Sequence, residues 1–284
     1  MIAIESVLAG LIDYAGLYPP AHLEMHAAVR NYLAYRRSPH ACALGRFVVD
    51  LDRVDELRAT AGDRIPDIKL SVLATPKSDW KILSRLLQDR VMIEAVESKA
   101  SSLADIERII WNVPRGLEIY LEVPNESLTP EILDAMAALG AHMKLRMGGV
   151  VAAAFPGTDA VVSMLVRLNQ HRVACKATAG LHHPIRSHHP YTYAHDSPAG
   201  AMHGFVNLIC AAALIHFGGD SKEAKYLLDE QDVGAFDLTE RALSWRSHNW
   251  TVSQLNEVRE KFLISFGACS FEEPIHDLET MGWL

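Results

Sequence analysis

Short runs of apolar residues recur along the chain and alternate with segments in which apolar residues follow helical spacing. Such runs are typical of strands buried on both faces, because a half-exposed strand would alternate apolar and polar positions. The run centres recur roughly every 22 to 31 residues, which suits a repeating strand–helix unit. The clearest runs cover residues 45–50, 68–75, 91–96, 117–123, 141–147 and 173–179.

The gaps between these runs carry helix signals. Ser102 and Asp105 resemble a capping box, and Thr129 before Pro130 is typical of a helix start. We expect helices over 23–35, 51–61, 80–87, 102–110, the segment from 130, 158–171 and 202–217.

Both ends of the chain are harder to assign. Residues 7–14 fit either a first strand or a short helix. We expect the last strand within 235–245, a final helix over 252–263, and an irregular loop over 180–200 that contains three prolines.

About eight strand–helix units in 284 residues predict a (β/α)8 TIM barrel. We expect one domain over 1–284, with a histidine-rich loop at 180–200 and a C-terminal helix and tail at 251–284. The alternative is a doubly wound open sheet, but no G-x-G-x-x-G follows the first strand, so a dinucleotide fold has no support.

Composition narrows the function classes. The formal charge of −8 argues against a nucleic-acid partner, since phosphate binding needs a basic surface. The longest apolar stretch, 205–217, is too short to cross a membrane. The four cysteines form no C-x-x-C pair, and the N-terminus does not resemble a signal peptide. We therefore expect a cytoplasmic protein in which Cys175 and Cys210 are core residues.

Charged side chains gather where two neighbouring strands end. Lys144 and Arg146 share one strand face, Lys176 lies on the next strand, and Glu122 ends an earlier one. In a barrel, such positions carry the reacting groups. A lysine beside another cation has its ammonium form disfavoured, so its pKa is expected to fall and its amine can attack a carbonyl.

The turn Lys176-Ala177-Thr178-Ala179-Gly180 is similar to the Lys-Thr-Ser-Thr-Gly turn of the deoxyribose-phosphate aldolases. That resemblance implies a (β/α)8 Schiff-base enzyme in which Lys176 is the nucleophile and Lys144 its cationic neighbour. In that family the second lysine follows the nucleophile, whereas Lys144 precedes Lys176, so the two roles can be exchanged. The resemblance implies no cofactor.

Histidines offer a competing site. His182 and His183 leave the same strand end, and four more histidines follow by residue 203. With Glu122 or Asp13 they could bind zinc, iron or manganese, although no H-x-H or H-E-x-x-H signature is present. A polar loop that binds nothing fits the same pattern.

Further residues are expected at the site. Residues expected to contact the substrate are Tyr14, Thr178, Gly148, Gly149, His203 and Asn207. Cys269, in a turn near the C-terminus, is a further candidate for a nucleophile.

The sequence therefore predicts a lyase of the aldolase type acting on a small anionic carbonyl compound. In this prediction Lys176 is the nucleophile and Lys144 lowers the pKa of Lys176. Arg146 binds a carboxylate or phosphate of the substrate, and Glu122, Asp13 or His182 transfers protons. A metal-dependent hydrolase, isomerase or lyase and a non-catalytic ligand-binding barrel are the alternatives. A homo-oligomer is compatible with all three.

Overall fold

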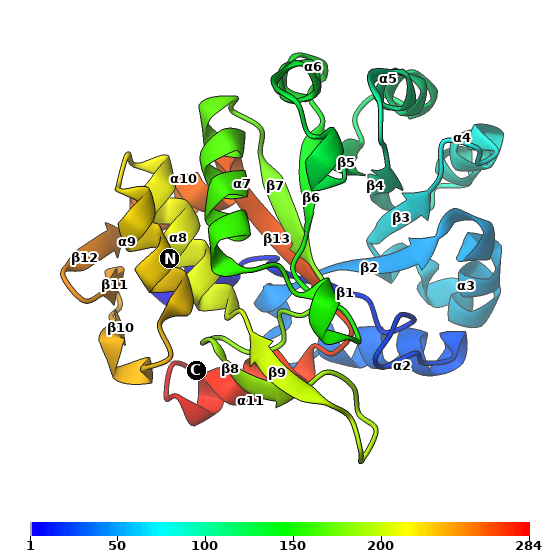
Figure 1. Cartoon of the computed structure of the whole chain (residues 1–284). Coiled ribbons are helices and arrows are strands. Elements are labelled where there is room, and N and C mark those ends of the chain that lie inside the picture. The colour runs from blue at the N-terminus through cyan, green and yellow to red at the C-terminus, as the bar shows by residue number, and fades with distance from the viewer. Residues whose placement is uncertain (1) are drawn as a thin grey trace.

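A closed barrel of eight parallel strands forms the centre of the molecule (Figure 1). The computed structural model describes residues 2–284. Strands β1 to β7 follow one another around the barrel, and β13 closes it by pairing with both β7 and β1. The (β/α)8 prediction is therefore confirmed. The barrel strands are β1 (Ile12–Tyr14), β2 (Leu44–Asp50), β3 (Leu70–Ala74), β4 (Ile93–Lys99), β5 (Glu118–Glu122), β6 (His142–Arg146), β7 (Cys175–Thr178) and β13 (Leu263–Ala268).

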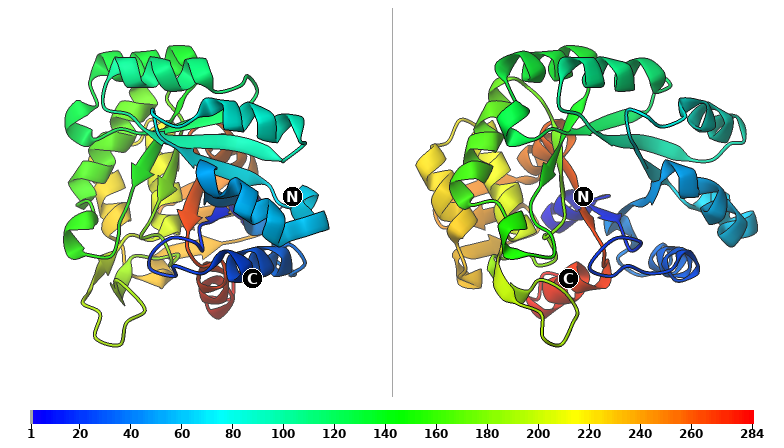
Figure 2. Two further views of the ribbon diagram at one scale, coloured as in Figure 1. Left: turned by 90° about the vertical axis from the view of Figure 1, so that its right-hand side faces the viewer. Right: turned by 45° about the vertical axis from the view of Figure 1, so that its right-hand side comes forward.

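Helices surround the strands on the outside (Figure 2). Their starts follow the sequence signals: the Ser102 side chain accepts from the Asp105 N–H, and the Thr129 side chain accepts from the Ile132 N–H. Such N-caps satisfy helix N–H groups that otherwise lack partners. The helices are α1 (Ala3–Leu8), α2 (Met25–Tyr35), α3 (Val54–Ala61), α4 (Trp80–Gln88), α5 (Leu103–Asn112), α6 (Pro130–Leu139), α7 (Thr158–Gln170), α8 (Phe205–His216), α9 (Ser221–Asp229), α10 (Val252–Lys261) and α11 (Glu272–Thr280).

The hydrophobic core continues from the barrel into the helix layer. Cys175 in β7 and Cys210 in α8 are fully buried, as expected. Helix α8 is apolar except for Asn207 and His216, and all its residues from Phe205 to Ile215 are buried. A helix of this composition needs neighbours all round it. Among the described residues, no helix has the length and apolarity needed to cross a bilayer.

The eighth strand was predicted in the wrong place. Residues 236–251 form a separate antiparallel sheet of β10 (Phe236–Leu238), β11 (Ala242–Trp245) and β12 (His248–Thr251). The helix expected over 252–263 ends at Lys261, and the barrel strand β13 begins at Leu263. The apolar run of β13 follows the helix so closely that its first residue was included in the helix pattern. The final helix is α11 instead.

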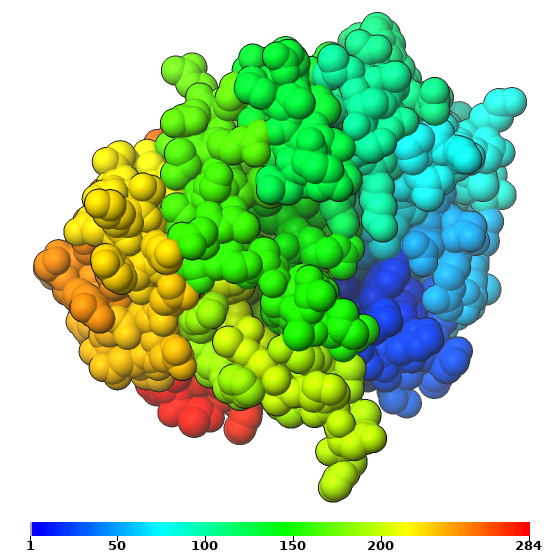
Figure 3. All heavy atoms as spheres, in the orientation of Figure 1, coloured from blue at the N-terminus to red at the C-terminus, as the bar shows by residue number. Residues whose placement is uncertain are grey.

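The loop after β7 is more regular than predicted. Strands β8 (Ser187–Pro190) and β9 (Ala199–Met202) form an antiparallel hairpin, with Ser187 opposite Met202. The tip of this hairpin projects from the body of the molecule (Figure 3). Its strands were missed because each has only four residues and the prolines at its tip usually mark loops.

The N-terminal segment contains both elements that its sequence fitted. Helix α1 precedes β1, and Gly10 between them adopts a left-handed conformation with φ +57°. Strand β1 pairs with β2 on one side and β13 on the other. This pairing fixes Asp13 inside the barrel.

Candidate active site

A cavity of about 360 Å³ lies at the end of the barrel where the strands terminate. Seven of the residues expected at the site line this one space: Lys144, Arg146, Gly149, Lys176, Thr178, His182 and His183. The β8–β9 hairpin forms part of its wall through Pro190 to Tyr193 and Met202. This is the face of a (β/α)8 barrel that carries reacting groups in enzymes of this fold.

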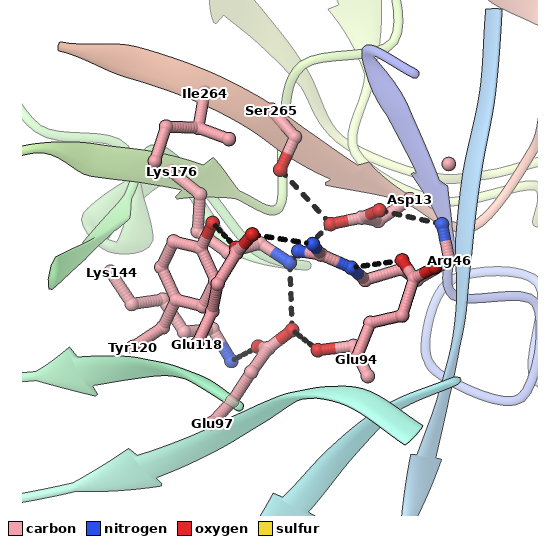
Figure 4. Close-up of polar contacts among 12 residues, drawn as sticks. Asp13, Arg46, Glu94, Glu97, Glu118, Tyr120, Lys144, Lys176, Ile264 and Ser265 are labelled. Atoms are coloured by element: carbon pink, nitrogen blue, oxygen red, sulfur yellow. Dashed lines mark hydrogen bonds and ion pairs between the residues drawn. The ribbon is translucent and has the colours of Figure 1, made fainter. Parts of the chain in front are cut away.

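The floor of the cavity is a buried network of two lysines and two carboxylates (Figure 4). Lys176 Nζ donates to Asp13 Oδ2 at 2.5 Å and to Glu97 Oε1 at 2.7 Å. Lys144 Nζ lies 2.7 Å from the other oxygen of the same carboxylate, Glu97 Oε2. Lys144 and Lys176 are directly paired in the β6–β7 register, so adjacent strands deliver both ammonium groups to Glu97. We call Asp13, Glu97, Lys144 and Lys176 the floor network.

The floor network changes the expected chemistry of Lys176. Burial alone would lower the pKa of this lysine, but the nearby Asp13 and Glu97 carboxylates outweigh burial and raise it. The expectation of a lowered pKa at Lys176 is therefore wrong. That expectation considered only the second cation, Lys144, and omitted the carboxylate between the two ammonium groups.

Glu97 is held in its ionised form. Burial would raise the pKa of this carboxyl, but Lys144 and Lys176 lower it well below its usual range. The Ser71 hydroxyl donates a further hydrogen bond of 2.6 Å to Glu97 Oε1. Glu97 is only 1% exposed, so its negative charge is compensated by these partners and not by water.

Asp13 is positioned by backbone and side-chain donors from neighbouring strands. Its Oδ1 accepts from the Arg46 backbone N–H at 2.7 Å, and its Oδ2 accepts from the Ser265 hydroxyl at 3.0 Å. A Cβ atom at Gly45 would lie 2.4 Å from Asp13 Oδ1. The glycine therefore provides the space that lets β2 approach this carboxylate.

A second ion pair lies beside Lys144, and of its two members Arg146 lines the cavity whereas Glu122 does not. Arg146 donates to both oxygens of Glu122, at 2.8 and 3.2 Å. Glu122 is also 3.8 Å from Lys144 Nζ. The Arg146 side chain remains 47% exposed and lines the cavity, so its remaining donors can meet a ligand.

One wall of the cavity combines residues from three segments. His182 lies between Cys269 and Glu273: its Nε2 is 3.9 Å from Cys269 Sγ, and its Nδ1 is 2.6 Å from Glu273 Oε2. The Tyr193 hydroxyl donates to the same Glu273 oxygen at 3.0 Å. We call Cys269, His182 and Glu273 the thiol cluster. Of its members, Glu273 was not identified from the sequence.

The turn after β7 brings His182 back toward the barrel. Ala179 and Gly180 both have left-handed φ, of +61° and +69°. A Cβ atom at Gly180 would lie 2.8 Å from Cα of Gly148, so the exits of β6 and β7 touch there. A larger residue at either glycine would separate the two strand ends that carry the lysines.

His183 also lines the cavity, but its Nδ1 is directed at helix α11. Its Nδ1 is 2.6 Å from Asp277 Oδ2, and its ring stacks on His189 at 3.4 Å between centroids. Within residues 2–284, no group of three or more His, Cys, Asp or Glu side chains is arranged to hold a metal ion. The metal hypothesis for His182 and His183 stays a prediction that this geometry does not favour.

The remaining candidates divide between the cavity and the core. Gly149 and Thr178 line the cavity. Tyr14 is 1% exposed and packs edge-to-face on Tyr35 and Phe47. Gly148 contributes the close contact between strand ends described above.

His203 and Asn207 hold the β8–β9 hairpin onto the barrel. Asn207 is fully buried and accepts from the Arg186 N–H while donating to the carbonyls of Leu227 and Glu230. His203 lies 2.8 Å from the Pro156 carbonyl oxygen. Neither residue lines the cavity.

Glu97 is the main site residue that sequence reasoning missed. It follows the apolar run 91–96, and the structure extends that strand to Lys99. A carboxylate inside an extended apolar strand was the available signal, since such a group requires a buried partner.

The fold and the site together define a (β/α)8-barrel protein with a charged cavity at the C-terminal mouth of the barrel. No protein-family model and no curated protein matches the sequence. Among solved structures, the chain is similar to a mutant of FabK from Thermotoga maritima, at 15% identity and a TM-score of 0.38. The match covers 65% of this chain and 59% of that chain. At this level the likeness carries no argument about chemistry, and the fold rests on the closed barrel itself.

Proposed function

We propose that this protein is an enzyme that acts on a small carbonyl compound with an anionic group, through a Schiff base on Lys144. The observation that carries the proposal is the sharing of Glu97 by two lysines that differ in access. Both lysines line the cavity, but Lys176 is 0% exposed and is held by Asp13 and Glu97 at 2.5 and 2.7 Å. Lys144 is 8% exposed and has one carboxylate that close, Glu97 at 2.7 Å, with Glu122 farther away at 3.8 Å. The aldolase resemblance implies Lys176 as the nucleophile and Lys144 as its neighbour. In this proposal the two lysines exchange these roles.

Glu97 suits an intermediate that carries positive charge. The Lys144 amine attacks the carbonyl carbon, the carbonyl oxygen leaves as water, and a protonated imine remains. That iminium replaces the ammonium charge that Glu97 Oε2 already faces at 2.7 Å. The surroundings therefore need little reorganisation, which favours the intermediate. Lys176 stays protonated and keeps Glu97 ionised.

Glu122 and Arg146, the ion pair beside Lys144, are the residues proposed for proton transfer and substrate binding. Lys144 must lose a proton before it attacks. The Glu122 carboxylate, 3.8 Å from its Nζ, takes this proton and returns it to the carbonyl oxygen, which leaves as water. Arg146, at the cavity edge, provides donors for a carboxylate or phosphate. The proposal requires no cofactor, and a lyase that breaks a bond next to the imine carbon is the reaction class it favours.

The test is borohydride trapping with pyruvate, a small anionic carbonyl compound, followed by peptide mapping. We expect an adduct on Lys144 in the parent protein and none on this peptide in Lys144→Met. Lys99→Met, which removes an exposed lysine from the end of β4, is the matched control and should trap pyruvate normally. Trapping on Lys176, or equal trapping on several exposed lysines, would refute the assignment.

A further inference from the structure

We propose that the cavity contains a second covalent site, in which Cys269 attacks a small activated acyl compound and His182 and Glu273 assist it. The ligand class is an ester or thioester of a small acid. This site uses none of the floor lysines, so it stands independently of the Schiff-base proposal. It is inferred from a cluster of three groups and the cavity that they line.

The three side chains come together from separate parts of the chain. Cys269 directly follows β13, His182 follows the left-handed turn after β7, and Glu273 lies in the first turn of α11. All three line the cavity of about 360 Å³. The two histidine nitrogens have different partners: Nε2 faces Cys269 Sγ at 3.9 Å, and Nδ1 faces Glu273 Oε2 at 2.6 Å. The structure thus places side by side a nucleophile, a base and a carboxylate that orients the base.

The surroundings of Cys269 differ from those of the other three cysteines. Cys175 and Cys210 are fully buried in the core, where burial raises the pKa of each thiol. Such thiols are inert. Cys42 is exposed on a short helical turn. Cys269 differs from all three because it lines a cavity beside an imidazole.

His182 is held in a form that supports this chemistry. Burial would lower its pKa, but its hydrogen bonds to Cys269 and Glu273 outweigh burial and raise the pKa to about 10. The imidazole is therefore protonated near neutral pH, and an imidazolium beside a cysteine can pair with a thiolate. The Tyr193 hydroxyl fixes the Glu273 oxygen that contacts His182.

The reaction balances without any further reactant except water. The Cys269 thiolate attacks the acyl carbon and forms a carbon–sulfur bond, and the bond from that carbon to the leaving oxygen or sulfur breaks. The leaving group takes the electron pair and receives the proton of His182. Neutral His182 then removes a proton from water, whose oxygen attacks the thioester. The acid leaves, and the thiolate–imidazolium pair is restored.

The first test measures acylation with p-nitrophenyl acetate at neutral pH. We expect a burst of nitrophenol and an acetyl group on the Cys269 peptide that hydroxylamine removes, as it removes thioesters. Cys269→Ser should abolish the burst, while Cys42→Ser, the control for a free thiol outside the cavity, should retain it. An acetyl group found only on lysines, or a full burst in Cys269→Ser, would overturn the proposal.

The second test separates activation from mere accessibility. Iodoacetamide alkylation of Cys269 and Cys42 is followed by peptide mapping in the parent, His182→Asn and His195→Asn proteins. We expect the alkylation rate of Cys269 to fall at least about tenfold in His182→Asn, because Cys269 Sγ loses the imidazole nitrogen that lies 3.9 Å away. Cys42 should be unchanged, and His195→Asn should behave like the parent. Alkylation of Cys269 at the same rate in all three proteins would overturn the role of His182. Thermal unfolding verifies that each variant is folded.

Discussion

Replacing Glu97 by glutamine removes the one carboxylate that both floor lysines share. The amide keeps the shape of the side chain but removes its negative charge. Its oxygen can accept from only one of the two lysines, so the other lysine faces the amide NH2, and Asp13 remains a carboxylate partner of Lys176. Breaking one partner of a buried ion pair costs about 3–5 kcal/mol. We expect Glu97→Gln to lose about this much free energy of unfolding. For 284 residues, an unfolding entropy of about 0.6 kcal/mol/K converts that loss to a fall of about 5–8 °C in Tm.

The matched control is Glu94→Gln on the same strand. Glu94 also contacts two cations, Arg46 and Lys69, but its side chain is 32% exposed. Exposed pairs contribute about 0–1 kcal/mol. The assay is urea unfolding at neutral pH, followed by circular dichroism and tryptophan fluorescence, with Tm from calorimetry. A Glu97→Gln protein no less stable than Glu94→Gln would refute the view that the two floor lysines depend on Glu97 for charge compensation.

Three further results are expected. The pKa of Glu97 is lowered in the folded state, so its contribution is present above its unfolded pKa of about 4.3 and is lost as pH falls. The stability gap between parent and Glu97→Gln should therefore shrink on acidification from about pH 5 to about pH 3; a constant gap in urea unfolding would contradict this. Asn207→Ala should lower the free energy of unfolding by about 3 kcal/mol, because it leaves buried backbone groups unpaired. The control is Asn112→Ala at an exposed position. Equal urea unfolding midpoints for the two variants would refute this prediction. Arg146→Ala should raise the half-saturating pyruvate concentration about tenfold in the trapping assay, since a hydrogen bond to a charged group contributes about 1.5–3 kcal/mol. The half-saturating concentration of acetone, which lacks the anionic group, should not change. An equal effect on both compounds would argue for a structural role of Arg146.

Most of the barrel could be predicted because its strands and helices have distinct local periods. Seven of the eight strands fall in or next to predicted segments, since residues buried on both faces leave a continuous apolar run. The eighth failed because α10 ends at Lys261 and β13 begins at Leu263, so one apolar pattern runs across two elements. Short antiparallel strands at 236–251 provided a competing assignment.

The site was predictable in position but not in charge balance. Strand alternation places Lys144 and Lys176 at one end of the barrel, and the structure pairs them in register. The sequence alone does not show that Glu97, from another strand, lies between them, because that contact depends on barrel closure. The same holds for the thiol cluster. Cys269 and His182 are 87 residues apart, and only the pairing of β13 with β7 makes them neighbours.

We propose that Lys144, and not Lys176, reacts with a carbonyl compound in the cavity at the barrel mouth. The most direct measurement is a crystal structure of the protein after borohydride reduction in the presence of pyruvate. We expect electron density continuous with Lys144 Nζ, with the pyruvate carboxylate near Arg146 and Lys176 still bound to Asp13 and Glu97. Density joined to Lys176, or two unmodified lysines after complete reduction with excess pyruvate, would contradict it.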